Sequence, residues 1–101
     1  MTRNVDLDLS NVPAGEVASA AARALLDERG WKITDLAKWL DRHAAAVSMF
    51  VTGRIDYPST RMVDSVCKVF GVSRSEFWSL GEELVAARLT SPVQPPGQLP
   101  N

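Results

Sequence analysis

The strongest constraint on the fold lies in residues 29–58, where two short apolar repeats flank a polar break. Each repeat has the spacing of one helix face. The repeats are formed by Leu36, Ala37 and Leu40, and then by Val47, Phe50 and Val51. Gly53 follows the second repeat, and glycine takes the left-handed conformation at a helix C-terminus without strain. The pattern therefore predicts helices over about 33–40 and 44–52, joined by a tight turn.

Two short helices joined by such a turn form a helix-turn-helix, whose second helix can enter the major groove of DNA. The stretch also resembles the lambda-repressor/Cro-like helix-turn-helix proteins, or XRE family. The resemblance rests on Arg29-Gly30-Trp31, Leu36-Ala37-Lys38-Trp39-Leu40, Val47, Gly53 and Pro58, and on a last-helix entry at Val69–Phe77. It covers about residues 16–80. It implies an all-α, five-helix lambda-repressor-like domain that binds DNA.

Three further helices are expected around this pair. An Ala- and Leu-rich helix runs from Pro13 to Arg29, and another runs from a Ser59 or Thr60 cap to Phe70. A fifth helix begins at Ser73-x-x-Glu76, which has the form of a capping box. Inward-facing residues expected on these helices are Val17, Ala21, Ala24, Leu25, Met62, Val63, Val66, Val69, Phe70, Phe77, Leu80 and Leu84. Gly81 and a second capping signal, Ser79-x-x-Glu82, predict a break and a short extra C-terminal helix over 82–89.

The 101 residues leave room for one domain, expected at 13–89. Residues 1–12 are expected to form an N-terminal arm, in which Val5, Leu7 and Leu9 alternate with Asp6, Asp8 and Ser10. This alternation suggests an extended arm that packs on the domain or on a partner; a disordered arm is an equal alternative. Residues 90–101 carry four prolines, a glycine and no charge, which predicts a disordered tail.

Charge is distributed unevenly along the chain. The net charge is −1, whereas nucleic-acid-binding domains are usually basic. Residues 29–61, however, carry six basic and three acidic side chains, a net of +3, while residues 1–28 have a net of −3. The positive segment coincides with the helix-turn-helix, which favours a DNA-binding surface there. Chance fluctuation is the alternative explanation.

Candidate DNA contacts are the N-terminal and outward residues of the third helix together with the flanking basic side chains. They are Lys32, Arg42, His43, Ala44, Ala45, Ser48, Met49, Thr52, Arg54 and Arg61. The helix lacks Gln or Asn for adenine and Arg for guanine, although its alanines and Met49 can touch thymine methyl groups.

Several other functions are excluded by what the sequence lacks. The single cysteine, Cys67, cannot form an internal disulfide and is expected to be a small core residue. His43 has no potential ligand at metal-binding spacing, so no metal site is expected. No catalytic constellation or cofactor motif is visible, which predicts a protein that is not an enzyme. Without a signal peptide or a run of roughly 20 apolar residues, a cytoplasmic protein that does not enter membranes is expected.

The favoured function is a sequence-specific DNA-binding transcriptional regulator, a small repressor or Cro-like protein of phage or bacterial origin, acting on double-stranded DNA. A homodimer is expected through Trp78, Val85 and Leu89, which exceed what a five-helix core needs; alternatively, the last helix folds back onto the first.

Two alternative functions remain open. One is the antitoxin of a toxin–antitoxin pair, in which the arm or tail grips a protein partner. The other is a protein-interaction module that has lost DNA binding. Three features favour the module: Ile33 in place of the family's usual Gln, the alanine-rich third helix and the acidic pI of about 5.7. Asp41-Arg42, in place of the usual Gly and apolar residue, is a further departure that weakens the DNA-binding interpretation.

Overall fold

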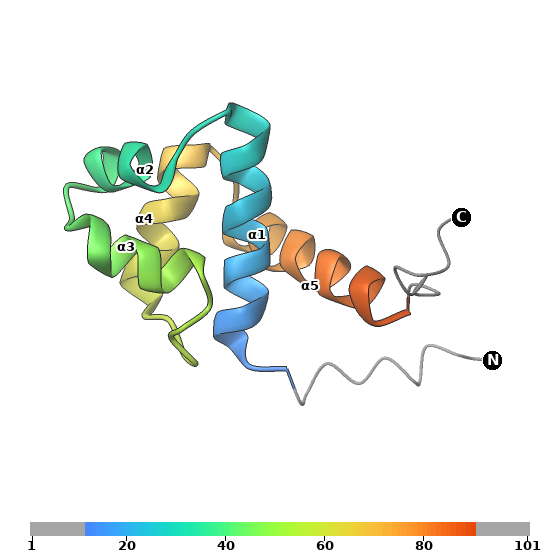
Figure 1. The fold of residues 1–101 in the computed structure, drawn as a ribbon. Coiled ribbons are helices and arrows are strands. Elements are labelled where there is room, and N and C mark those ends of the chain that lie inside the picture. The colour runs from blue at the N-terminus through green and yellow to red at the C-terminus, as the bar shows by residue number, and fades with distance from the viewer. Residues whose placement is uncertain (1–11, 91–101) are drawn as a thin grey trace, which may run out of the picture.

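A computed structural model describes residues 12–90, which form five helices and no strand (Figure 1). The helices are α1 (Ala14–Arg29), α2 (Ile33–Leu40), α3 (Ala44–Val51), α4 (Thr60–Phe70) and α5 (Arg74–Thr90). The all-α, five-helix prediction is confirmed, and α3 ends one residue earlier than expected. The predicted arm and tail lie, apart from Val12 and Thr90, outside the described residues.

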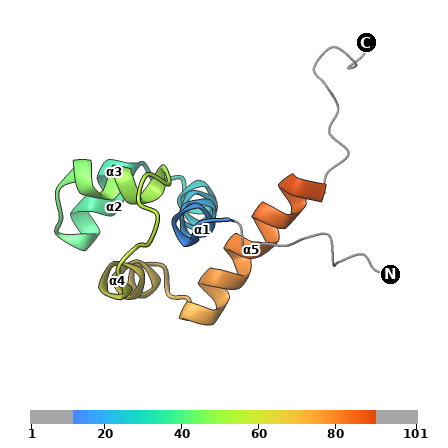
Figure 2. The ribbon, with the colours of Figure 1, turned by 90° about the horizontal axis from the view of Figure 1, so that it is seen from below.

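The first helix is the centre of the arrangement. Helices α2, α3 and α4 lie on one side of α1, and α5 crosses its other side (Figures 1 and 2). The most extensive packing between two helices of the described part is that of α1 on α5. Because α1 is covered on two sides, an almost continuous run of its residues from Val17 to Ala22 is buried.

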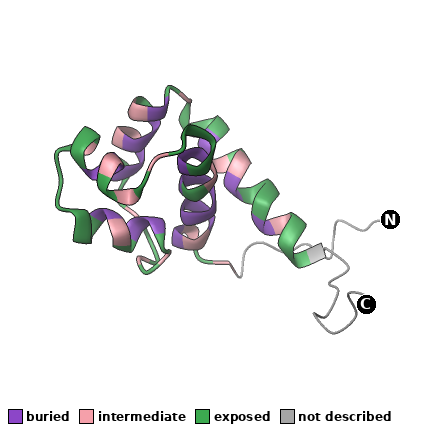
Figure 3. Ribbon diagram, turned by 45° about the horizontal axis from the view of Figure 1, so that its top comes forward, coloured by how far each residue is buried: buried purple, intermediate pink, exposed green. Residues whose placement is uncertain are grey.

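One apolar core is shared by all five helices, whose buried residues lie on the sides that face one another (Figure 3). A second, smaller cluster of Val17, Ala20 and Val85 joins α1 and α5. The largest buried members of the shared core are Phe50, Phe77 and Leu36, together with Val47, Val63 and Val66. The rings of Phe50 and Phe77 lie parallel, with centroids 6.5 Å apart. Most of the predicted inward-facing residues lie in this core. Ala24, Val69 and Leu80 are only partly buried.

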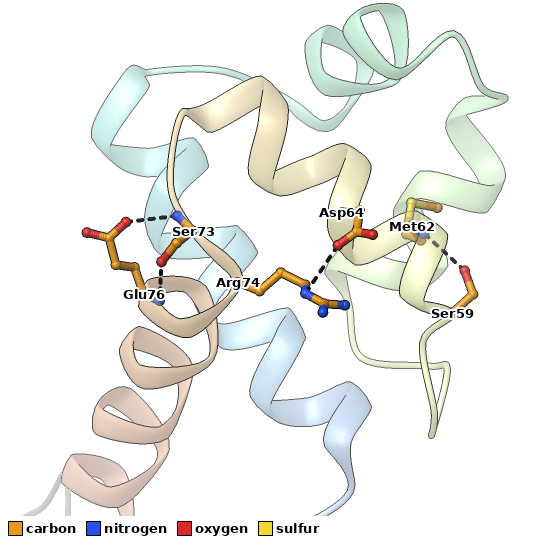
Figure 4. Close-up of polar contacts among 6 residues, drawn as sticks. All are labelled: Ser59, Met62, Asp64, Ser73, Arg74 and Glu76. Carbon is orange, nitrogen blue, oxygen red and sulfur yellow. Dashed lines mark hydrogen bonds and ion pairs between the residues drawn. The ribbon is translucent and has the colours of Figure 1, made fainter.

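The N-termini of α4 and α5 are capped by side-chain hydrogen bonds, as the sequence predicts (Figure 4). The Ser59 hydroxyl accepts a hydrogen bond from the Met62 amide at 3.1 Å. The Ser73 hydroxyl accepts from the Glu76 amide at 3.0 Å, and the Glu76 carboxylate accepts from the Ser73 amide at 2.8 Å. These bonds satisfy amides that the first turn of a helix leaves without an intrahelical partner.

The predicted break at Gly81 is wrong, because α5 runs through it to Thr90 without interruption. No separate helix over 82–89 forms. A Cβ built on Gly81 would lie 2.3 Å from the carbonyl oxygen of Val17, so this glycine lets α5 approach the backbone of α1. Glycine costs roughly 1 kcal/mol in a helix interior, and the close packing of α1 on α5 offsets that cost.

The continuous helix also changes which residues of α5 face the core. Phe77, Gly81 and Val85 follow one another at four-residue spacing on the side toward α1, and Val85 packs against Val17 with 1% of its surface exposed. Leu84, predicted to face inward, is 36% exposed.

The expectation that Val85 serves a dimer surface is therefore wrong, because this side chain is buried within its own chain. Trp78 is half-buried and packs on the same core. Of the three residues expected at a dimer interface, only Leu89 is mostly exposed. The alternative, in which α5 folds back onto α1, describes the structure.

Candidate nucleic-acid interface

The turn between α2 and α3 is tight. Asp41 adopts the left-handed conformation with φ of 56°, a region that aspartate tolerates better than most residues. Its amide donates to the Lys38 carbonyl at 3.2 Å, and the Arg42 amide donates to the Ala37 carbonyl at 3.1 Å, so the last carbonyls of α2 are satisfied. His43 precedes α3, but its imidazole is exposed and makes no capping hydrogen bond.

The third helix has a buried side and an outward side. Val47, Phe50 and Val51 are at most 1% exposed and fix the helix on the core. The opposite side carries residues at i, i+3, i+4 and i+7 spacing, which form one stripe. We call this stripe the α3 face; it consists of Ala45, Ser48, Met49 and Thr52. Ser48 is partly buried, and the other three are exposed.

The C-terminal end of α3 is anchored on α1. The Ser19 hydroxyl, which is 1% exposed, donates a hydrogen bond to the Val51 carbonyl. The Gly15 amide donates to the Asp56 carbonyl at 2.8 Å in the loop after α3. A Cβ at Gly15 would overlap the carbonyl oxygen of Ile55, so only glycine allows this approach. These contacts set the position of the α3 face relative to α1.

Gly53 has a φ of 77°, which confirms the predicted left-handed conformation after α3. It allows the chain to reverse so that the Arg54 amide donates to the Met49 carbonyl at 3.0 Å. The backbone of Arg54 is thereby held against the end of α3.

Two grooves border α3. The first, of about 660 Å³, lies between α2 and the start of α3 and is lined by Thr34, Ala37, Lys38, Asp41, Arg42, His43 and Ala44. The second, of about 280 Å³, lies between α1, the start of α2 and the end of α3 and is lined by Arg23, Leu26, Asp27, Trp31, Lys32, Ile33, Val51 and Thr52. Basic side chains therefore lie beside both ends of α3.

The predicted phosphate-binding side chains Lys32, Arg42, Arg54 and Arg61 are all exposed. The two ion pairs within residues 12–90 lie elsewhere: Arg74 with Asp64 at 3.4 Å (Figure 4), and Arg88 with Glu16 at 3.6 Å. Over the described range, the four predicted cations are thus not paired with a carboxylate.

Arg29, which also contributes to the positive segment, is used inside the fold. Its guanidinium donates to the Phe70 carbonyl at 2.8 Å and lies over the rings of Trp31 and Phe70, 5.6 Å and 5.3 Å from their centroids. A guanidinium stacked on two rings and bonded to a helix C-terminus stabilises the fold. The Arg29 guanidinium keeps its charge, but it is held at the C-terminus of α4 and has one donor committed to the fold.

The structure brings most of the predicted contact residues together around α3. Arg42, His43 and Ala44 line the first groove, and Lys32 lines the second with Thr52. Ala45, Ser48 and Met49 lie on the α3 face between them. Arg61 is exposed on the first turn of α4 and lines neither groove.

Sequence reasoning missed one residue of this surface, Arg23, and one exposed side chain in the loop after α3, Tyr57. Arg23 belongs to an acidic N-terminal segment, yet it lines the second groove with Lys32 because α1 passes beside the start of α2. Tyr57, in the loop between α3 and α4, is 82% exposed. In the sequence, Tyr57 stands between Arg54 and Arg61, and a tyrosine hydroxyl there could have been predicted to donate a hydrogen bond to a DNA phosphate.

Other chemistry has little support in the described residues. Between residues 12 and 90, no three His, Cys, Asp or Glu side chains are grouped so that they could hold a metal ion. Cys67 is buried as predicted, and burial, with a smaller effect of the Asp64 carboxylate, raises the pKa of its thiol. No helix in that range combines the length and apolar character needed to cross a bilayer.

A comparison with known protein families gives one match. A family described as a helix-turn-helix domain matches residues 17–78, which include α1 to α4 and the start of α5. No curated protein and no solved structure matches the chain.

Proposed function

Since this chain belongs to the helix-turn-helix domain family, we propose that it is a sequence-specific DNA-binding transcriptional regulator. The observation that carries the proposal is the exposed α3 face, with basic side chains beside both of its ends that form no ion pair within residues 12–90. In finer terms, we propose a small repressor or Cro-like protein of phage or bacterial origin. It acts in the cytoplasm by binding rather than by catalysis.

In the proposed complex, α3 enters the major groove and α2 crosses the DNA backbone. An α-helix with its side chains is about 10–12 Å across, which fits a major groove about 12 Å wide. Arg42 and Lys38 would meet phosphates beside the start of α3, and Lys32 and Arg54 would meet them beside its end. Arg61 and Tyr57 extend this set toward α4.

The experiment is a selection of binding sites from a random duplex library, followed by affinity measurements over a range of salt concentrations. Each lost phosphate contact lowers the salt-dependence slope by about 0.9. Arg42→Ala and Arg54→Ala should therefore weaken binding and each lower the slope by about one unit.

Arg88→Ala is the matched control, because it removes a positive charge from α5, across α1 from α3. It should leave both affinity and slope unchanged. Equal slopes for the wild type and both α3-flanking variants would refute the proposed interface.

A homodimer on a two-fold symmetric site is part of the proposal, because one copy of α3 contacts only a few base pairs. We place self-association on the exposed part of α5, where Leu84 and Leu89 are 36% and 57% exposed. Val85 and most of Trp78 pack within the monomer and are left out of this surface.

A protein-interaction module is the second candidate, and one observation favours it. Trp39 on α2 is 65% exposed and stacks on Trp31, with ring centroids 5.9 Å apart. Exposed tryptophans are frequent anchors of protein interfaces. A library selection that enriches no duplex would favour this second function over DNA binding.

A further inference from the structure

The α3 face is unusual in its chemistry. Helix α3 contains no charged side chain and no Asn or Gln. The largest exposed side chain on it is that of Met49, which is 46% exposed. The neighbouring Val47 and Phe50 are buried, so Met49 is not needed to complete the core. An exposed thioether at the middle of the α3 face therefore has an apolar contact surface available for a ligand.

The hydrogen-bonding capacity of this face is smaller still than its sequence suggests. The Thr52 hydroxyl donates its proton to the Ser48 carbonyl at 2.7 Å, so that proton is not available to a base. Of the α3 face, Ser48 then supplies the remaining hydroxyl donor, and it is partly buried. Side-chain hydrogen bonds can specify few base edges here.

In the major groove, base pairs differ in their donors and acceptors and in one apolar group, the C5-methyl of thymine. An apolar side chain can distinguish thymine from other bases only through this methyl. Building on the proposed function, we infer that Met49, with Ala45, selects DNA sites by contact with thymine C5-methyl groups. The basic side chains beside α3 supply affinity, and Met49 supplies the sequence preference.

The test compares thymine with deoxyuridine, which lacks the methyl group but keeps the O4 acceptor, the base pairing and the phosphate. Each thymine of the selected duplex is replaced in turn, and the full chain is titrated against each duplex. Burial of one methyl corresponds to about a fourfold change in affinity. One or more positions in each half-site should therefore bind about fourfold more weakly with deoxyuridine, and the other positions should not change.

Two variants assign this effect to the correct side chain. Met49→Ala should reduce the thymine-to-deoxyuridine ratio at the sensitive positions to near one. Arg54→Ala should weaken binding to both duplexes equally and keep the ratio. Because Met49 is exposed, Met49→Ala is expected to fold, and its circular dichroism spectrum checks this.

The outcomes separate this inference from the function on which it rests. Failure of the library to yield any bound duplex overturns both. A selected duplex that binds equally with thymine and deoxyuridine at every position overturns the inference alone. A ratio that survives in Met49→Ala also overturns it, because the preference would then come from duplex shape or from another residue.

Discussion

Gly81 offers the sharpest test of how α5 is held, because two effects of an alanine there have opposite signs. Helix propensity favours alanine over glycine by about 1 kcal/mol. Against this, the new Cβ would lie 2.3 Å from the Val17 carbonyl oxygen and 2.8 Å from its Cγ1. Since real Cβ atoms essentially never come closer than 3.0 Å, α1 and α5 would have to separate by about 0.7 Å.

Forcing an extra carbon into a packed interface costs about 1–3 kcal/mol. The upper part of that range, about 2–3 kcal/mol, applies here because the obstacle is a backbone atom that cannot rotate away. The clash therefore outweighs the propensity gain, and Gly81→Ala should lower the free energy of unfolding by about 1–2 kcal/mol. For a domain of this size, each kcal/mol corresponds to about 4–8 °C in Tm. The melting temperature should fall by about 4–16 °C.

Thermal unfolding followed by circular dichroism measures this change, and Ala87→Gly provides the control. Ala87 is exposed on the same helix, so its replacement reports the propensity cost of glycine without a contact to α1. Both variants should melt below the wild type, although the propensity terms have opposite signs. If Gly81→Ala instead melts above the wild type by as much as Ala87→Gly melts below it, the close approach to Val17 does not constrain the fold.

Two further predictions concern the end of α3 and self-association. Gly53→Val places a β-branched side chain at a φ of 77°, so it should destabilise the domain by about 1–3 kcal/mol in chemical denaturation; an unchanged midpoint would contradict this. In analytical ultracentrifugation at micromolar concentration, Leu89→Arg should convert the dimer to a monomer. It should not lower Tm, because Leu89 is 57% exposed. A wild-type protein that is monomeric both alone and on DNA would refute the dimer proposal.

The local parts of the fold could be predicted because their signals are local. Helix boundaries at 33–40 and 60–70, the Ser73–Glu76 capping box and the left-handed Asp41 all depend on residues within a few positions of one another. Gly81 shows where this reasoning fails. A glycine within a capping signal predicts a break. The residue that Gly81 contacts, Val17, is 64 positions earlier in the sequence, so no neighbouring residue indicates the contact.

The candidate interface also contains some residues that local sequence predicts and others whose position depends on distant contacts. The outward residues of α3 follow from helix periodicity once Val47 and Phe50 are assigned to the core, and the structure exposes them accordingly. By contrast, the role of Arg29 depends on Phe70, and the place of Arg23 beside Lys32 depends on how α1 passes α2. Charge counted along the sequence therefore includes one cation bound within the fold and omits one beside α3.

Helix α1 lies between α3, which is proposed to contact DNA, and α5, which is proposed to mediate self-association, and its alanines make this arrangement possible. By sequence they indicate only helix propensity, but Ala18, Ala21 and Ala22 are fully buried, and their small size lets neighbours approach from more than one side. Gly15 and Ser19 lie on one side of α1 and hold the end of α3.

Val17, on nearly the opposite side of α1, contacts Gly81 of α5. The helix proposed to contact DNA, α3, and the helix proposed for self-association, α5, thus lie on opposite sides of α1 (Figure 2). In a dimer formed through α5, the distance between the two α3 helices would be set by the packing around α1. A site with the wrong half-site spacing would then be rejected without any base contact.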